Sequence, residues 1–425
     1  MHDAPEYAWS FEPHHDFSFE LENLSSQELA DPAAIGSINY TADVYREGKQ
    51  IRRVGVAPLP EAVPVGEKRV FDAELGMSVV GGDYEVSFGI EPANGGEQLR
   101  FGSPRYPLRV KNTIFEPLVE LINACNFRCN FCPQGELQRK QRPMDFDLAK
   151  KILRDFADMG QKHPIRCHLL GEPLLYPRFF DFVEEAHDVG QRILLVTNGS
   201  RFQEENIEAI FRTKLDQLLI SLNTPEKEAY NEQRGTNMPF ETYMHGIERM
   251  VEEAVKREEG PETMINVLYD QSKTNDPDEI RRVNGLANQW VNLVRRSTGQ
   301  KELNIEEVDH FDPSLRTEIQ LYDNLRIMFQ PYHTWGEGES PELHFCAFPW
   351  KQLAILVDGQ ATACCVDSEG EINLGNVREK TVEEIWNGPE ITRIRDSFWN
   401  KQRAVEPRCM RCPIRHHELA ELYLN

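Results

Sequence analysis

The sequence has no apolar run long enough to cross a bilayer as a helix, which takes about 18 to 20 residues. Its first residues, MHDAPEYAWSFEPHHDF, also lack the basic start and apolar centre of a secretory signal peptide. We therefore expect a cytoplasmic protein with no membrane span.

Basic residues are scarce relative to acidic ones, with 47 Lys and Arg against 70 Asp and Glu, a net charge of −23. The acidic residues are spread along the whole chain and form no separate tail. Because nucleic acids and anionic membranes are bound by broad positive surfaces, neither is expected as a partner. A small-molecule or glycosylated substrate in a local pocket remains compatible with this charge.

A disulfide framework is not expected either, because the nine cysteines are odd in number and no secretory signal precedes them. All except Cys167 fall into two groups, Cys125, Cys129 and Cys132, followed by Cys346, Cys364, Cys365, Cys409 and Cys412. Cys167 lies in an apolar strand and is expected in the core. Grouped thiols in such a chain indicate metal binding.

Residues 1–110 read as a chain of short strands. Apolar and polar residues alternate at 17–21, 38–44 and 84–90, and turns rich in Gly and Pro separate them. This pattern predicts an antiparallel β-sandwich domain.

From residue 111 the rhythm changes to alternating strands and helices. The predicted strands are 116–122, 165–170, 192–197, 216–222, 263–269 and 303–308, and the predicted helices are 146–159, 177–190, 203–213, 239–257 and 276–296. Six such units over 111–310 indicate an α/β fold, a parallel sheet closed as a partial (β/α)6 barrel with its site at the carboxyl ends of the strands. Residues 311–425 form a third region, with a bridge at 311–345, a hairpin at 352–366, a helix from Val382 and a cysteine-rich end.

The first cysteine group has the spacing Cys-x3-Cys-x2-Cys directly after the first strand of the barrel. Three thiolates on a four-iron cube leave one iron open to a small molecule, whereas a fourth would close the cluster. A zinc site stays possible, but zinc would need a fourth ligand from elsewhere.

This motif, with Phe131 before the last cysteine, resembles the signature of the radical S-adenosylmethionine (SAM) superfamily. Segments at the next three strand ends agree: His168-Leu-Leu-Gly171-Glu172-Pro173, Val196-Thr-Asn198-Gly199, and Ile220-Ser221-Leu-Asn223 followed by Arg234-Gly235. The resemblance implies that Cys125, Cys129 and Cys132 hold a [4Fe–4S] cluster. It also implies that SAM is bound by Phe131, Gly171, Glu172, Asn198, Ser221, Asn223 and Arg234.

The family resemblance further implies the chemistry. Reductive cleavage of SAM gives a 5′-deoxyadenosyl radical, which abstracts hydrogen from the substrate, and a flavodoxin- or ferredoxin-type protein supplies the electron.

The second cysteine group resembles the SPASM/twitch extensions of that superfamily, in particular those of radical SAM dehydrogenases of aminocyclitol precursors. The resemblance implies an auxiliary [4Fe–4S] cluster on Cys346, Cys364, Cys409 and Cys412. Adjacent residues of a strand face opposite ways, so Cys365 is expected as a packed thiol and not as a ligand. A structural zinc on four cysteines is the alternative.

Together these features predict a radical SAM oxidoreductase with two [4Fe–4S] clusters that dehydrogenates or epimerises a sugar, aminocyclitol or glycosylated substrate. Modification of a peptide or protein and non-catalytic electron transfer are the alternatives. Residues 1–110 resemble the glycan-binding β-sandwich of polysaccharide ABC exporters, which implies carbohydrate recognition, against a structural or dimerisation role. Candidate substrate contacts are Glu306, Asp309, His310, His333 and Trp335.

Overall fold

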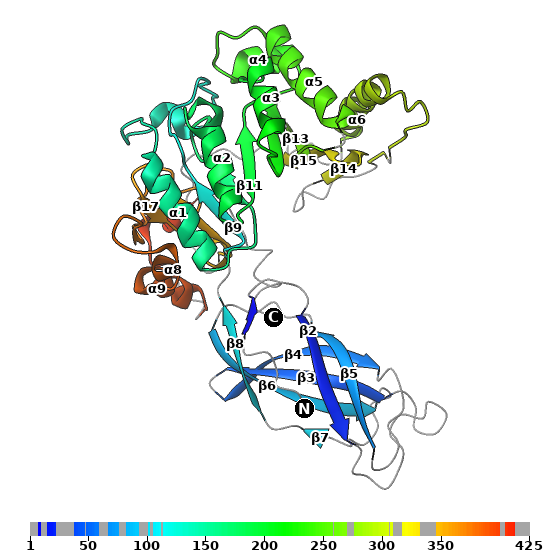
Figure 1. Cartoon of the computed structure of the whole chain (residues 1–425), viewed down its shortest axis with the longest axis vertical. Helices are drawn as coiled ribbons and strands as arrows, with labels where there is room; N and C mark the ends of the chain where they lie inside the picture. Colours follow the sequence, from blue (N-terminus) through cyan, green and yellow to red (C-terminus); the bar gives the residue numbers. More distant parts are fainter. Residues whose placement is uncertain are drawn as a thin grey trace. The chain divides into compact units, whose positions relative to one another are not determined.

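A computed structural model gives the fold of the chain. It describes residues 7–9, 15–22, 38–46, 48–58, 67–75, 82–92, 101–102, 105–111, 114–257, 259–269, 276–305, 307–308, 317–331, 346–399 and 404–412. These residues fall into two compact units, one before and one after the boundary between Phe115 and Glu116. Figure 1 shows both units.

The first unit consists of strands in two sheets. The larger has the order β1-β8-β6-β3-β4, with β7 paired to β6, and the smaller joins β2 to β5. The bounds are β1 Tyr7–Trp9, β2 His15–Glu22, β3 Ile38–Arg46, β4 Lys49–Pro58, β5 Lys68–Leu75, β6 Gly82–Pro92, β7 Phe101–Gly102 and β8 Tyr106–Lys111. Every pairing is antiparallel except that of β1 with β8, so the strands predicted for this region are confirmed.

The second unit is built on one sheet of ten strands in the order β14-β15-β13-β12-β11-β10-β9-β16-β17-β18. Its strands are β9 Glu116–Val119, β10 Ile165–Cys167, β11 Ile193–Thr197, β12 Gln217–Asn223, β13 Glu262–Tyr269, β14 Thr317–Tyr322, β15 Leu325–Pro331, β16 Gln352–Ile355, β17 Gln360–Thr362 and β18 Gly375–Asn376. The run from β16 to β15 through β9–β13 is parallel throughout. The predicted partial barrel is consistent with this sheet.

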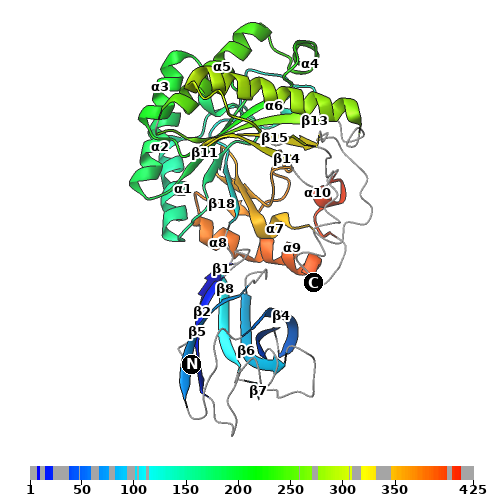
Figure 2. The same cartoon turned by 90° about the vertical axis from the view of Figure 1, so that its right-hand side faces the viewer.

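Helices line one side of the curved sheet, as Figure 2 shows. They are α1 Phe146–Asp158, α2 Phe179–Asp188, α3 Glu204–Arg212, α4 Lys227–Gln233, α5 Phe240–Lys256 and α6 Pro277–Thr298, with short helices η1 Pro133–Glu136 and η2 Pro173–Leu175 in the loops. The C-terminal part adds α7 Phe348–Lys351, α8 Val382–Trp386, α9 Pro389–Trp399 and α10 Pro407–Met410.

The sheet has one apolar and one mixed face. In β12, Leu218, Ile220 and Leu222 are fully buried, whereas the residues between them are partly exposed. Because side chains alternate along a strand, Ser221 and Asn223 lie on the mixed face. Polar side chains therefore lie on the face opposite the apolar core.

The predicted strand at 303–308 is wrong in the residues that the structure describes there, which are neither strand nor helix. The sixth parallel strand is β15, from the region that the sequence suggested as a bridge, and it pairs with β13 over its whole length. A long connection separates α6 from β15, so the regular alternation of strands and helices in the sequence does not predict this strand.

A buried ion pair joins the sheet to the C-terminal hairpin. The guanidinium of Arg139 donates two hydrogen bonds of 2.8 Å to the fully buried carboxylate of Glu120, and its Nε donates to the Ser368 carbonyl at 2.8 Å. The N–H of Val357 also donates to Glu120, at 3.2 Å. Burial nevertheless raises the pKa of Glu120, so the carboxylate depends on these partners to stay ionised.

We expect Arg139→Met to lower the free energy of unfolding of the larger unit by about 3 to 5 kcal/mol, because Glu120 is left buried without its partner. Chemical denaturation followed by circular dichroism measures the change. The control is Arg142→Met, whose half-exposed pair with Asp358 at 3.7 Å contributes about 1 kcal/mol or less. Equal losses in the two variants would contradict the role of the Arg139–Glu120 pair.

Candidate functional site

The first cysteine group lies on a loop after β9 that is fastened to the segment following α4. The N–H of Arg128 donates to the carbonyls of Arg234 and Gly235, both at 3.2 Å, and the Cys129 thiol donates to Arg234 at 3.7 Å. Gly235 has a φ of 55°, and a Cβ there would lie 2.2 Å from the Arg128 oxygen. Only glycine allows the two segments to approach so closely.

The three thiols of this loop are close enough to influence one another's ionisation. Burial raises the pKa of Cys129 and Cys132, and it raises the pKa of Cys125 to about 11. The guanidinium of Arg234 opposes this shift at Cys129. The thiols are therefore protonated near neutral pH until a metal displaces their protons.

Three thiols on one short loop can ligate three irons of a four-iron cube and leave the fourth iron open. A zinc ion would need a fourth ligand from elsewhere in the chain.

Glu172 connects the cysteine loop to two strand ends. Its N–H donates to the Ala124 carbonyl at 3.0 Å, directly before the first cysteine. Its carboxylate accepts hydrogen bonds from Leu174 N–H at 3.0 Å, Thr197 Oγ1 at 2.7 Å and Asn198 N–H at 2.7 Å. The carboxylate is thus oriented by the protein and still has acceptor capacity for one amine.

Glu172 is buried in a closely packed environment. The residue is 1% exposed, and burial raises the pKa of its carboxyl although three hydrogen bonds lower it. A Cβ on the preceding Gly171 would lie 1.8 Å from the carbonyl oxygen of Ile122, so glycine is required there. The predicted Gly171-Glu172 pair therefore lies directly against the cysteine loop.

Arg234 is a buried cation with unused donors beside the same loop. It is 1% exposed, and its guanidinium carbon lies 4.9 Å from the Phe127 ring centre, 6.0 Å from Phe131 and 5.8 Å from Tyr243. Its Nε and Nη2 have no hydrogen-bond partner among the described residues. A buried guanidinium with free donors suits an anionic group such as a carboxylate.

Tyr243 is a residue of this site that the sequence reading missed. It is stacked on Tyr230, with ring centres 4.8 Å apart, and its buried hydroxyl has no hydrogen-bond partner among the described residues. Burial raises its pKa to about 12, with smaller influences from Arg234, Cys129 and Glu172. Its place within α5 gave no signal, because an apolar position of an amphipathic helix reads as core.

Asn198 lies next to the first cysteine. Its Nδ2 is 3.6 Å from the Cys125 sulfur, and its N–H donates to Glu172. Ser221 and Asn223 lie further along the sheet, where Asn223 has a φ of 55° and accepts a hydrogen bond from Asn266 at 3.0 Å. The predicted SAM-contact residues are thus distributed over the loop after β9, the ends of β10 to β12 and the segment after α4.

The second cysteine group is brought together from distant parts of the chain. The thiol of Cys364 is influenced by Cys365, Cys346 and Cys409, and that of Cys346 by Cys409, Cys412 and Cys365, so Cys365 also lies near this group. Burial raises the pKa of Cys346 and Cys364, and that of Cys409 to about 12. Four partly buried thiols can close a cluster, one just before α7, one in the loop after β17, one in α10 and one just after α10.

Cys365 has a different environment from that of Cys364. It packs with Cys132 against an apolar cluster formed by Leu169, Leu170 and Leu356. Its N–H donates to Gln352 Oε1 at 3.2 Å, and burial raises its pKa to about 12. The structure therefore gives Cys365 an apolar packing surface, and its exclusion from the ligands stays a prediction.

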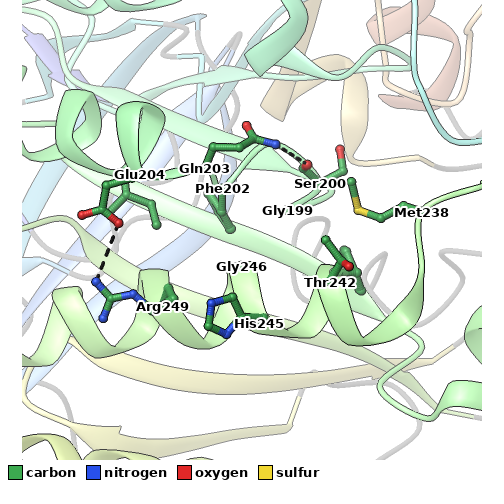
Figure 3. A pocket seen from close by; sticks show the side chains of 12 residues that line it. Gly199, Ser200, Phe202, Gln203, Glu204, Met238, Thr242, His245, Gly246 and Arg249 are labelled. Atoms are coloured by element: carbon green, nitrogen blue, oxygen red, sulfur yellow. Dashed lines mark hydrogen bonds and ion pairs between the residues drawn. The ribbon is translucent and has the colours of Figure 1, made fainter.

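A pocket of about 270 Å³ lies between α3 and α5, beside the end of β11. Figure 3 shows Ser200 and Gln203 at its upper side and Thr242, His245 and Arg249 along α5 below. The Arg249 guanidinium lies 3.7 Å from the Glu204 carboxylate across the pocket. Its lining is mixed in polarity, and Ser200 connects it to the Asn198 region.

Comparison with known proteins agrees with this geometry. Residues 119–280 match the radical SAM superfamily, and residues 346–413 match the SPASM iron–sulfur cluster-binding domain. The chain contains a radical SAM domain followed by a SPASM domain. A radical SAM domain implies SAM and a [4Fe–4S] cluster, and a SPASM domain implies auxiliary iron–sulfur clusters. The predicted family, fold class and cofactors are confirmed.

Two curated relatives match about two thirds of this chain. The AdoMet-dependent heme synthase of Methanosarcina barkeri is 24% identical over 64% of this chain and 82% of its own length. The tungsten-containing aldehyde ferredoxin oxidoreductase cofactor-modifying protein of Pyrococcus furiosus is 24% identical over 70% of this chain and 86% of its own.

Among solved structures, the crystal structure of BtrN in complex with AdoMet and 2-DOIA overlaps with a TM-score of 0.40 at 14% identity. It covers 67% of this chain and 87% of that one. An overlap of this size does not bear on the reaction of this radical SAM protein.

The predictions of no membrane span and of the substrate-contact residues are only partly addressed by the structure. No helix among the described residues is long and apolar enough to cross a membrane. The candidate substrate contacts Glu306, Asp309, His310, His333 and Trp335 lie outside the described residues.

We expect Gly235→Ala to lower the bound iron by up to about half, because the added Cβ pushes the Arg128 backbone and with it Cys129 out of place. Iron analysis after anaerobic reconstitution measures the loss. The matched control is Gly285→Ala in α6, where a Cβ would meet nothing within 4 Å. That variant keeps its iron and gains up to about 1 kcal/mol in stability. Full iron in Gly235→Ala would show that the loop tolerates the displacement.

Proposed function

We propose that this radical SAM protein is an oxidoreductase that removes hydrogen from a sugar, aminocyclitol or glycosylated substrate. The observation that supports it best is the presence of two separate cysteine sites, one with three thiols and one with four. Three thiols leave an iron open for SAM, whereas four close a cluster that can only move electrons. A chain with one cluster open to SAM and one closed cluster that accepts an electron suits a net two-electron oxidation of the substrate.

In this proposal Cys125, Cys129 and Cys132 hold the SAM-cleaving cluster. The free donors of Arg234 bind the SAM carboxylate, and Glu172 accepts from its amino group. Phe131, Gly171, Ser221 and Asn223 complete the surroundings of SAM. When bound and reduced by a flavodoxin- or ferredoxin-type partner, this group supplies the 5′-deoxyadenosyl radical that takes hydrogen from the substrate.

Cys346, Cys364, Cys409 and Cys412 hold the auxiliary cluster, which takes the electron that the substrate loses. Support comes from the apolar cluster of Leu169, Leu170 and Leu356, because it contacts both Cys132 and Cys365, the neighbour of Cys364. The apolar cluster therefore packs against one thiol from each cysteine group. An apolar layer also excludes water from a reactive intermediate.

The proposed substrate class is supported by polar side chains on the mixed face of the sheet. Strand register places Glu116 beside Gln352 and Arg166 beside Leu118 on one face. Arg166 and Glu116 form an ion pair at 3.4 Å, and Gln352 donates to Glu116. Such fixed donors and acceptors suit a hydroxylated molecule better than an apolar one.

His168 directly follows β10 and supplies a neutral imidazole. Burial, helped by the Arg166 charge, lowers its pKa to about 4. A neutral imidazole at this strand end can accept a hydrogen bond from a substrate hydroxyl group.

Modification of a peptide, protein or bound cofactor is the second candidate. The relatives named as a heme synthase and as a cofactor-modifying protein favour the bound-cofactor form of it, because each matches about two thirds of this chain. Anaerobic enzyme incubated with sugar, aminocyclitol and peptide libraries, with 5′-deoxyadenosine release as the signal, separates the two candidates. Release by peptides alone would overturn the carbohydrate proposal.

We assign substrate recognition to residues 1–110, the radical SAM chemistry to 111–310 and the auxiliary cluster to 311–425. Deletion of residues 1–110 is expected to leave both clusters in place, because the two compact units have separate cores. It should raise KM for substrate far more than it slows SAM cleavage without substrate. Iron analysis and steady-state kinetics measure both, and an insoluble product would indicate a structural role.

We expect the double variant Cys409→Ser/Cys412→Ser to lose about half of the ~8 iron atoms and still release 5′-deoxyadenosine. Oxidised product should be lost, because the electron acceptor is gone while the SAM-binding thiols are unchanged. Iron analysis and mass spectrometry of deuterated substrate and products measure this separation.

Two controls accompany that double variant. Cys365→Ala should behave almost like the parent, and Cys125→Ala should lose both half of the iron and SAM cleavage. Normal product without the auxiliary cluster would remove the electron-acceptor role and favour epimerisation. Stoichiometric zinc with little iron would contradict the proposal as a whole.

A further inference from the structure

The sulfur of Cys125 accepts two N–H groups. The backbone N–H of Phe127 lies 3.5 Å away and the side-chain Nδ2 of Asn198 lies 3.6 Å away. Among the described residues, Asn198 supplies the only side-chain donor to a thiol of the first cysteine group. It lies 73 positions further along the chain, at the end of a different strand.

The amide of Asn198 is held in one orientation. Its Oδ1 accepts the N–H of Ser200 at 2.8 Å, and its Nδ2 also donates to Asn126 Oδ1 at 3.1 Å. A reversed amide would set an NH2 group against the Ser200 N–H and an oxygen against both Asn126 Oδ1 and the sulfur. The donor therefore has to face Cys125.

Asn126 is fixed in turn by Ser200. Its Nδ2 donates to Ser200 Oγ at 2.8 Å, and that hydroxyl lies 3.2 Å from Asn126 Oδ1. Ser200 is 3% exposed, and the Asn198 backbone N–H is tied to Glu172 at 2.7 Å. The side chains of Asn126, Asn198 and Ser200 are thus hydrogen-bonded to one another. The remaining N–H of the Asn198 amide points at the Cys125 sulfur.

We propose that Asn198 is a positioning residue that raises the reduction potential of the cluster held by Cys125, with Asn126 and Ser200 keeping it in place. Reduction adds negative charge that is shared by the thiolates, and a hydrogen bond to a thiolate stabilises the more negative form more strongly. The inference rests on the proposed ligand role of Cys125 and on no particular substrate.

The test is the potential of the first cluster in the full-length, anaerobically reconstituted protein. The probe is SAM, because the cluster whose electron paramagnetic resonance signal changes on SAM addition is the first one. In Asn198→Leu we expect about a tenfold less favourable reduction, a shift of 59 mV to more negative potential for a one-electron couple. Asn198→Asp should shift it at least as far in that direction, because it also adds a negative charge.

The matched control is Asn130→Leu, an exposed asparagine on the same loop, which should keep the parent potential. Ser200→Ala removes the hydroxyl that fixes Asn126 and should give a smaller shift of the same sign with full iron. An unchanged potential in Asn198→Leu with full iron would overturn the inference. If the Asn198 variants lose iron, Ser200→Ala decides the matter, and an unshifted potential there would overturn it. Retained first-cluster iron in Cys125→Ala would instead refute the ligand assignment of the proposed function.

Discussion

The buried carboxylate of Glu172 holds together the segments that form the site, and the rest of the site depends on it. It links the end of β11 to η2 through three hydrogen bonds, while its own N–H binds Ala124 before the cysteine loop. A buried charge without such partners would cost several kcal/mol, so the strand ends and the loop are held in one arrangement. The position of Cys125, and of the Asn198 amide beside it, follows from that arrangement.

The charged and ionisable groups around Glu172 have their positions before any ligand binds. Arg234 is buried among Phe127, Phe131 and Tyr243 with donors to spare, while the neighbouring thiols have raised pKa values. The cation therefore offers a place for a negative group, and the neutral thiols reduce repulsion before the metal arrives. Strands of the SPASM domain and of the barrel belong to one sheet. The Arg139–Glu120 pair also holds the C-terminal hairpin to that sheet.

Local patterns predicted much of the fold correctly. The strands β9 to β13 follow from short apolar runs between amphipathic helices, whose period is set by backbone geometry. The strand β15 was missed because its hairpin with β14 comes after a long connection, and only pairing with β13 makes it part of the barrel. Tyr243 was missed because its apolar position on α5 reads as core until its unpaired hydroxyl is seen.

The sequence by itself determined the two cysteine groups, their spacing and the family motifs at successive strand ends, because these features lie within short segments. Only the tertiary structure decided their partners. Cys129 meets Arg234 across 105 positions, Asn198 meets Cys125 across 73, and Arg139 meets Ser368 across 229. Contacts of that kind depend on strand order and register. The same local sequence pattern is compatible with several strand orders, so it does not determine these contacts.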